Sequence, residues 1–178
     1  MKKTLFFLLN GCSTSRKIKN TSTANGANHS NVIKNKNSGR DINSKNVSTN
    51  DVVSFAETLI GIKYKYGAES VEDGFDCSGF VNYVFNHFGI SVPRVTVDFT
   101  NAGNEVPVEE SKPGDIILFT GSNAKSRRVG HVGIIIENEN GNVKFIHAST
   151  SRGVMISGMN SYFMPRFIKV NRVFPESQ

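Results

Sequence analysis

Cysteine and long apolar segments are both scarce in this chain, and each absence restricts what the protein can be. The 178 residues include only two cysteines, Cys12 and Cys77. If Cys12 is modified, no internal disulfide is possible and Cys77 is the one remaining thiol. The apolar run at residues 5–9 is far shorter than the ~20 residues that a membrane-spanning helix needs, which argues against a transmembrane segment there.

Acidic residues are almost missing from one part of the chain. Residues 13–50 contain seven basic residues and a single acid, Asp41, whereas residues 51–178 contain 12 basic and 14 acidic residues. The net charge of +6 therefore comes from the N-terminal part, and the remainder is near neutral. We expect no nucleic-acid site, and the basic segment suits contact with an anionic membrane or polymer surface.

The N-terminus has the pattern of an export signal. Two lysines at positions 2 and 3 precede the apolar run, which is followed by Leu-Asn-Gly-Cys at residues 9–12. This tetrapeptide resembles the lipobox of bacterial lipoproteins, in which the cysteine becomes the lipidated first residue of the mature chain. We predict a signal peptide over residues 1–11 and a lipid on Cys12 that holds the protein at a membrane. An ordinary signal with a coincidental cysteine is the alternative.

Residues 12–50 are dominated by Asn, Ser, Thr and Lys and contain no aromatic residue. The segment shows neither helical nor strand periodicity, so we predict a disordered tether between the lipidated cysteine and a folded domain over residues 51–178.

Two helices are expected at the start of the folded domain. Asp51 is the predicted N-cap of the first helix, which ends at Gly61. Its apolar positions at helical spacing are Val52, Phe55, Ala56, Leu59 and Ile60. The second helix is predicted to start around residues 76–79, with Cys77 in its first turn and on its apolar face, and to run to about Phe88, stopping at Gly89. The other members of that face are Phe80, Val81, Val84, Phe85 and Phe88.

The second half of the domain has the pattern of a sheet. A short third helix is expected over residues 96–102, after which turn residues separate candidate strands. These strands are residues 115–120, 131–137, 143–148, 154–157 and 166–174. Helices followed by antiparallel strands indicate an α+β domain.

Cys77 is a candidate nucleophile. At the first turn of a helix, free backbone N–H groups and the helix dipole stabilise a thiolate. The alternative is that Cys77 is only a small buried hydrophobic residue. An unpaired thiol in an exported protein is unusual, which favours the chemical role.

A thiol nucleophile needs a general base and a group that orients it. Of the four histidines, His29 lies in the predicted tether and His87 is rotated away from the helix face that carries Cys77. His131 opens an apolar strand between two glycines that leave space for a ring or a ligand, and is the predicted base. His147 lies on the next strand, on the same face as Phe145, where its ring could meet that of His131.

Two further interpretations come from the same residues. The phenol of Tyr64 could donate a hydrogen bond to an oxyanion beside the backbone N–H of Cys77. Alternatively, Cys77, His131 and His147 could be ligands of a zinc ion, since catalytic zinc accepts three such side chains.

Several segments together resemble the NlpC-type family of papain-like cell-wall cysteine peptidases across residues 51–178. They are YKYG at 64–67, FDCSGFV at 75–81, VPR at 92–94, KPGD at 112–115, GHVGI at 130–134, FIHAS at 145–149 and GV at 153–154. The resemblance implies N-terminal helices packed on a mainly antiparallel sheet of about five to six strands.

The resemblance also implies roles for individual residues. Cys77 would be the nucleophile, His131 the base, His147 the orienting residue and Tyr64 a group near the oxyanion. In members that recognise a free N-terminal alanine of the stem peptide, the residues flanking the cysteine bind substrate. That role would fall to Asp76 and Ser78 here.

The implied activity is hydrolysis of peptidoglycan stem-peptide bonds or of D-alanine to meso-diaminopimelate cross-links. Cleavage of the γ-D-glutamyl to diamino acid bond is one alternative, and an acyltransferase, an amidase or a non-catalytic wall-binding lipoprotein are others. The lipobox and tether are most similar to outer-membrane lipoprotein members of the family in Gram-negative bacteria, which implies the periplasmic face of the outer membrane. We expect a monomer with peptidoglycan and the membrane as partners, and no metal or other cofactor.

Overall fold

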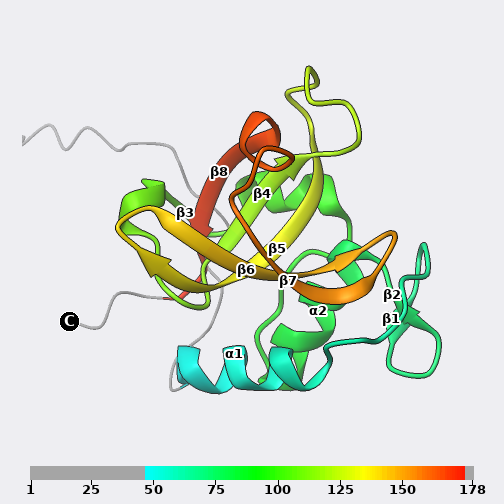
Figure 1. Cartoon of the computed structure of the whole chain (residues 1–178). Helices are drawn as coiled ribbons and strands as arrows, with labels where there is room; N and C mark the ends of the chain where they lie inside the picture. Colours follow the sequence, from blue (N-terminus) through cyan, green and yellow to red (C-terminus); the bar gives the residue numbers. More distant parts are fainter. Residues whose placement is uncertain (1–46, 175–178) are drawn as a thin grey trace, which may run out of the picture. The chain divides into compact units, whose positions relative to one another are not determined.

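The computed structural model describes residues 47–174, and Figure 1 shows how their helices and strands are arranged. The predicted signal peptide, Cys12, His29 and nearly all of the predicted tether lie outside these residues. The helices are α1 (Thr49–Thr58), α2 (Cys77–His87) and the 3-10 segments η1 (Thr96–Asn101), η2 (Val108–Glu110) and η3 (Met164–Arg166).

Six antiparallel strands form the main sheet, in the order β3-β8-β4-β5-β6-β7. Their bounds are β3 Asn104–Val106, β4 Ile116–Thr120, β5 Val129–Glu139, β6 Asn142–Ser149, β7 Gly153–Gly158 and β8 Phe167–Arg172. A separate two-stranded hairpin pairs β1 (Glu69–Ser70) with β2 (Gly74–Phe75). Both α-helices lie on one side of the main sheet (Figure 1), which confirms the expected α+β class.

Helix α1 begins earlier than the sequence predicts. Its N-cap is Ser48, whose hydroxyl accepts a hydrogen bond from the backbone N–H of Asn50. The prediction of Asp51 as N-cap is wrong. Asp51 lies in the first turn, where its negative charge interacts favourably with the positive end of the helix dipole. Ile60 was expected on the buried face but is 50% exposed, because α1 ends at Thr58 and the chain turns before Ile60.

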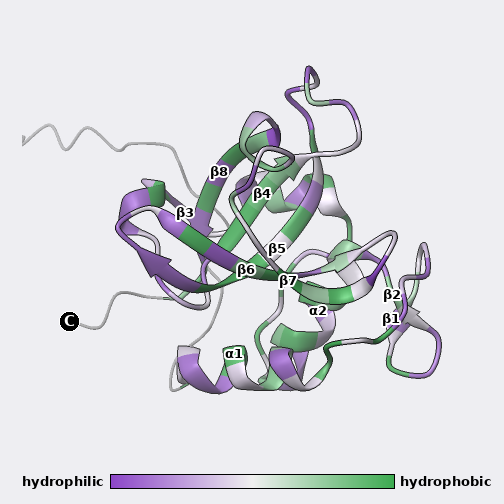
Figure 2. Cartoon of the chain, in the orientation of Figure 1, coloured by the Kyte–Doolittle hydropathy of each residue, from purple (hydrophilic) through white to green (hydrophobic). Residues whose placement is uncertain are grey.

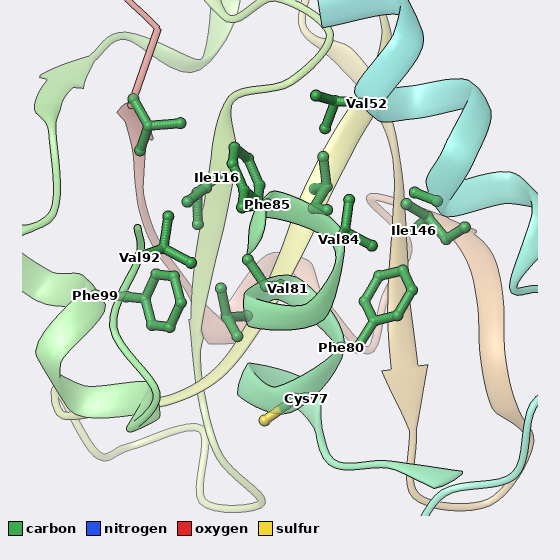
Figure 3. Packing of buried hydrophobic residues seen from close by; sticks show 14 of the residues in the cluster. Val52, Cys77, Phe80, Val81, Val84, Phe85, Val92, Phe99, Ile116 and Ile146 are labelled. Carbon is green, nitrogen blue, oxygen red and sulfur yellow. The ribbon is translucent and has the colours of Figure 1, made fainter. Parts of the chain in front are cut away.

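Helix α2 agrees closely with its prediction. It begins at Cys77 and ends at His87, and Gly89 follows it in the left-handed region at φ 71°. Figure 3 shows Cys77 at the N-terminal end of α2, while Phe80 and Phe85 project into the core. Apolar side chains from α1, α2 and one face of the sheet share this core.

The five predicted strands correspond to β4, β5, β6, β7 and β8. The sequence did not indicate β3, because its three residues are exposed or half-buried and show no apolar alternation. All five residues of β4 are buried, since a second cluster covers the other face of the sheet. Figure 2 accordingly shows hydrophobic residues gathered along the central strands β4 and β5 and on α2. None of the helices formed by residues 47–174 is long and apolar enough to cross a membrane.

Candidate active site

A cleft of about 560 Å³ brings four of the predicted site residues together. Tyr64 reaches it from the segment before β1, Cys77 from the first residue of α2, His131 from β5 and His147 from β6. The same cleft is lined by side chains from the β6–β7 turn and from the segment between β7 and β8. Below it is called the Cys77 cleft.

Cys77 is buried, with 7% of the residue exposed. Burial raises the pKa of Cys77, and this effect exceeds the opposing hydrogen bond with Thr96, whose Oγ1 lies 3.4 Å from Sγ. The backbone N–H groups of Ser78 and Val132 also lower the pKa without reversing the direction. The expectation that the helix start makes the thiolate easier to form is therefore wrong in its net result, because removal from water costs the charged form more. Burial thus favours the neutral thiol over the thiolate.

The histidines form a continuous relay with a residue that the sequence did not indicate. His131 Nε2 lies 2.9 Å from His147 Nδ1, and His147 Nε2 lies 3.0 Å from Ser157 Oγ. Burial lowers the pKa of His131 to about 4 and, together with the neighbouring His131, lowers the pKa of His147 to about 3. Both rings are therefore neutral at pH 7, and each carries a single N–H.

Strand pairing explains why these groups meet. Residues 134 and 146 pair between β5 and β6, and residues 145 and 157 pair between β6 and β7. His147 and Ser157 are therefore diagonal neighbours on adjacent strands, a distance that a histidine ring spans. Ser157 has no distinguishing local pattern, so only the register of β7 against β6 reveals it.

The two glycines around His131 allow the close approach of different neighbours. A Cβ on Gly133 would lie 2.9 Å from the Phe145 ring and 3.3 Å from His147 Cβ, so this glycine does leave space for a ring, as expected. A Cβ on Gly130 would lie 2.6 Å from the backbone nitrogen of Gly121. Gly130 therefore lets the Gly121 backbone approach closely, and it also lines the open Cys77 cleft.

Backbone contacts with β7 hold the segment that carries Tyr64. Gly61 donates to the Val154 carbonyl at 2.9 Å, and Val154 donates to the Ile62 carbonyl at 2.8 Å. Gly153, at φ 70°, permits this approach, because a Cβ there would lie 2.1 Å from the Ile62 oxygen. Burial, and the negative charge that Cys77 and Asp76 carry when ionised, raise the pKa of Tyr64, which favours the protonated phenol, the form that can donate.

Asp76 and Ser78 are buried and do not line the Cys77 cleft. The Asp76 carboxylate accepts hydrogen bonds from the backbone of Gly79 at 2.6 Å and Gly67 at 2.9 Å, and from both terminal nitrogens of Arg94 at 3.0 and 3.1 Å. Arg94 Nη1 also donates to Ser78 Oγ at 3.2 Å. Asp76 therefore caps the N-terminus of α2 and forms a bidentate ion pair with Arg94. Substrate binding by Asp76 and Ser78 stays a prediction.

His87 lies outside the Cys77 cleft, as expected, and stacks on Phe55 with ring centroids 3.8 Å apart. Within residues 47–174, no three His, Cys, Asp or Glu side chains are arranged to hold a metal ion. The zinc interpretation therefore has no supporting geometry, since the nearest nitrogens of His131 and His147 are hydrogen-bonded to each other.

Comparison with known proteins identifies relatives of the chain. It is 41% identical over 120 residues to "Murein DD-endopeptidase MepS/Murein LD-carboxypeptidase" of Escherichia coli, covering 66% of this chain and 58% of that protein. It is 34% identical over 128 residues to "Gamma-DL-glutamyl hydrolase" of Bacillus subtilis, covering 71% of this chain and 30% of the relative. The chain thus matches less than two thirds of the length of either relative.

Solved structures show the same fold. An NlpC/P60 family protein of Bacillus cereus superposes with a TM-score of 0.65 at 27% identity, over 72% of this chain and 41% of that one. The NlpC/p60 domain of the peptidoglycan hydrolase SagA gives a TM-score of 0.57 at 30% identity, over 71% of this chain and 99% of that one. The NlpC/P60 family model matches residues 61–172. On this evidence, the chain belongs to the NlpC/P60 family.

Proposed function

We propose that this protein hydrolyses amide bonds in the stem peptides of peptidoglycan, with Cys77 as nucleophile and His131 as general base. The observation that carries the proposal is the relay from His131 through His147 to Ser157 in the cleft that also holds the Cys77 thiol. Nε2 of His131 is hydrogen-bonded to His147. The other ring nitrogen of His131, Nδ1, is therefore the one that can accept the thiol proton.

The reaction begins from a neutral thiol and a neutral imidazole. His131 Nδ1 takes the proton as Sγ attacks the carbonyl carbon, and the backbone N–H of Cys77 with the Tyr64 hydroxyl stabilises the oxyanion. Collapse breaks the C–N bond, and the proton on His131 passes to the leaving amine. Water, deprotonated by His131, then hydrolyses the thioester and restores the free thiol. His147 accepts from His131 throughout and keeps its ring in the reactive tautomer.

The names of the relatives suggest two bonds. The murein DD-endopeptidase of Escherichia coli supports cleavage of the D-alanine to meso-diaminopimelate cross-link, which is the first candidate. The Bacillus subtilis relatives, a γ-DL-glutamyl hydrolase and a γ-D-glutamyl-L-lysine dipeptidyl-peptidase, support the γ-D-glutamyl bond as the second.

The proposal includes the placement of the domain. Residues 1–11 would be removed as a signal peptide, Cys12 would carry lipid, and residues 12–50 would tether a monomeric domain over residues 51–178 to the periplasmic face of the outer membrane. The lipobox-like residues 9–12 and the polar composition of residues 12–50 support this arrangement. Mass spectrometry of the membrane-extracted protein tests it: an unmodified Cys12 would contradict the anchor.

The function is tested by incubating the purified full chain with peptidoglycan and identifying released fragments by mass spectrometry, with Cys77→Ala as the control. Conversion of cross-linked dimers to intact monomers would establish cross-link cleavage, and shortened stems would establish γ-D-glutamyl cleavage. Unchanged peptidoglycan, or equal activity in Cys77→Ala, would refute the thiol mechanism.

A further inference from the structure

The Cys77 cleft has a charge that differs from the rest of the domain. Its lining includes two arginines, Arg152 and Arg166, and no aspartate or glutamate. Residues 51–178 as a whole carry 12 basic and 14 acidic residues. Since His131 and His147 are neutral at pH 7, the positive charge of the cleft comes from the two arginines alone.

Arg166 is held in place by backbone groups and an aromatic ring. Its Nη1 donates to the Tyr162 carbonyl at 2.7 Å, its Nη2 donates to the Ser122 carbonyl at 3.3 Å, and the guanidinium carbon lies 3.9 Å from the centroid of the Tyr162 ring. These two bonds use two of the five N–H donors of the guanidinium. The Nε atom is buried and has no hydrogen-bond partner among residues 47–174.

Neither arginine forms an ion pair within the described part of the chain, whereas Arg94 and Arg172 both do. Arg152 lies in the turn between β6 and β7, five positions after His147, and its side chain is exposed. The hydroxyl-bearing residues 149–151 lie between Arg152 and His147 and also line the cleft. Both charges are therefore presented at the site without a carboxylate of the protein to neutralise them.

A second hollow adjoins the Cys77 cleft and extends the same pattern. The two share Gly121, Ser122 and Gly130, and the second hollow adds Thr96, the hydrogen-bond partner of Cys77, and Arg128. No acidic residue lines it. A bound peptide that passes Cys77 would thus meet arginines and no opposing carboxylate along both hollows.

We propose that Arg152 and Arg166 form a carboxylate-binding subsite that selects peptides with a free carboxylate close to the bond that is cut. The guanidinium fork matches a carboxylate in geometry and charge, and such charge-assisted pairs are the stronger class of hydrogen bond. This inference rests on the proposed function and specifies its substrate. A γ-linked glutamyl residue keeps its α-carboxylate free and a diamino acid carries a further carboxylate, so stem peptides present this group in the charged form and lose it on amidation.

The test separates binding from turnover. The full chain carrying Cys77→Ala is titrated calorimetrically with two synthetic stem tetrapeptides that differ only in carboxylate against carboxamide at the glutamyl and diamino acid positions. We expect the carboxylate form to bind about tenfold more tightly in 50 mM salt. Equal affinities, or no measurable binding of either peptide, would overturn the subsite.

Substitutions then assign the preference to the two residues. Arg152→Gln changes an exposed side chain and should reduce the preference to about threefold or less, and Arg166→Lys, which keeps the charge but loses the fork, should reduce it partly. Arg127→Gln is the matched control, because Arg127 is exposed and lines neither hollow. An equal loss in Arg127→Gln would indicate general charge attraction and refute the assignment. If the binding preference is found while wild-type peptidoglycan hydrolysis is absent, the proposed function fails and the subsite stands.

Discussion

Replacement of Ser157 by alanine tests the relay directly. His147 is 3% exposed, so in Ser157→Ala its Nε2–H loses its acceptor in a place that water reaches poorly. A buried donor without a partner costs about 1–3 kcal/mol. The cost is avoided if the His147 proton moves to Nδ1, where it donates to His131 Nε2. The His131 proton then occupies Nδ1, the nitrogen that accepts the thiol proton in the proposed mechanism, so this tautomer should be inactive.

A free-energy difference of that size corresponds to a fall in kcat of about 5- to 150-fold, with a smaller change in KM. The assay is steady-state hydrolysis of a soluble cross-linked muropeptide across pH 5–8, accompanied by ¹⁵N NMR of the imidazole nitrogens to identify the tautomers. Ser157→Thr keeps a hydroxyl and should retain most activity. Ser70→Ala removes a hydroxyl of the β1–β2 hairpin outside the cleft, as a control. A Ser157→Ala enzyme with kcat within twofold of wild type, or a Ser157→Thr enzyme equally impaired, would refute the relay.

Three further predictions concern the surrounding structure. Gly133→Ala places a Cβ 2.9 Å from the Phe145 ring and should reduce the free energy of unfolding, measured by urea titration, by about 1–3 kcal/mol. Gly158→Ala is the control, because its Cβ would lie 3.8 Å from the nearest atom, the Val143 carbonyl oxygen, and should change that free energy little. Equal losses in the two variants would contradict the packing argument. Arg94→Met leaves a buried carboxylate without its ion-pair partner and should reduce the free energy of unfolding by about 2 kcal/mol. Loss of the exposed Lys65 to Asp73 pair should change it little, and similar losses in the same titration would mean that burial does not matter. Burial lowers the pKa of His131 to about 4, against 6.5 unperturbed, so the unfolded chain binds more protons between these pH values, and the contribution of His131 to the free energy of unfolding should be complete above pH 6.5 and decrease toward pH 4. For the same reason the acid limb of the kcat/KM profile should lie well below pH 6.5. A limb near pH 6.5 would show that the proposed base is not desolvated.

Local pattern was enough to predict the elements whose burial has a regular period. Helix α2 and strands β4 to β8 carry apolar residues at helical or strand spacing, and glycines mark where several of them end. The start of α1 and the edge strand β3 were not predicted correctly. A hydrogen bond from the backbone N–H of Asn50 to the Ser48 hydroxyl decides the first. Pairing with β8 decides the second, and neither leaves a periodic signal in the sequence.

The sequence by itself determined which residues bear the reactive groups: a lone thiol at a helix start, and two histidines on consecutive strands that the structure brings within 2.9 Å of each other. Tertiary structure alone decided how those groups are tuned. Burial raises the pKa of Cys77 and lowers those of both histidines, the register of β6 and β7 brings Ser157 to His147, and the β6–β7 turn and η3 bring Arg152 and Arg166 to one cleft. The physical reason is that desolvation and hydrogen bonding depend on which distant segments pack together, and a side chain's own neighbours in sequence do not report that packing.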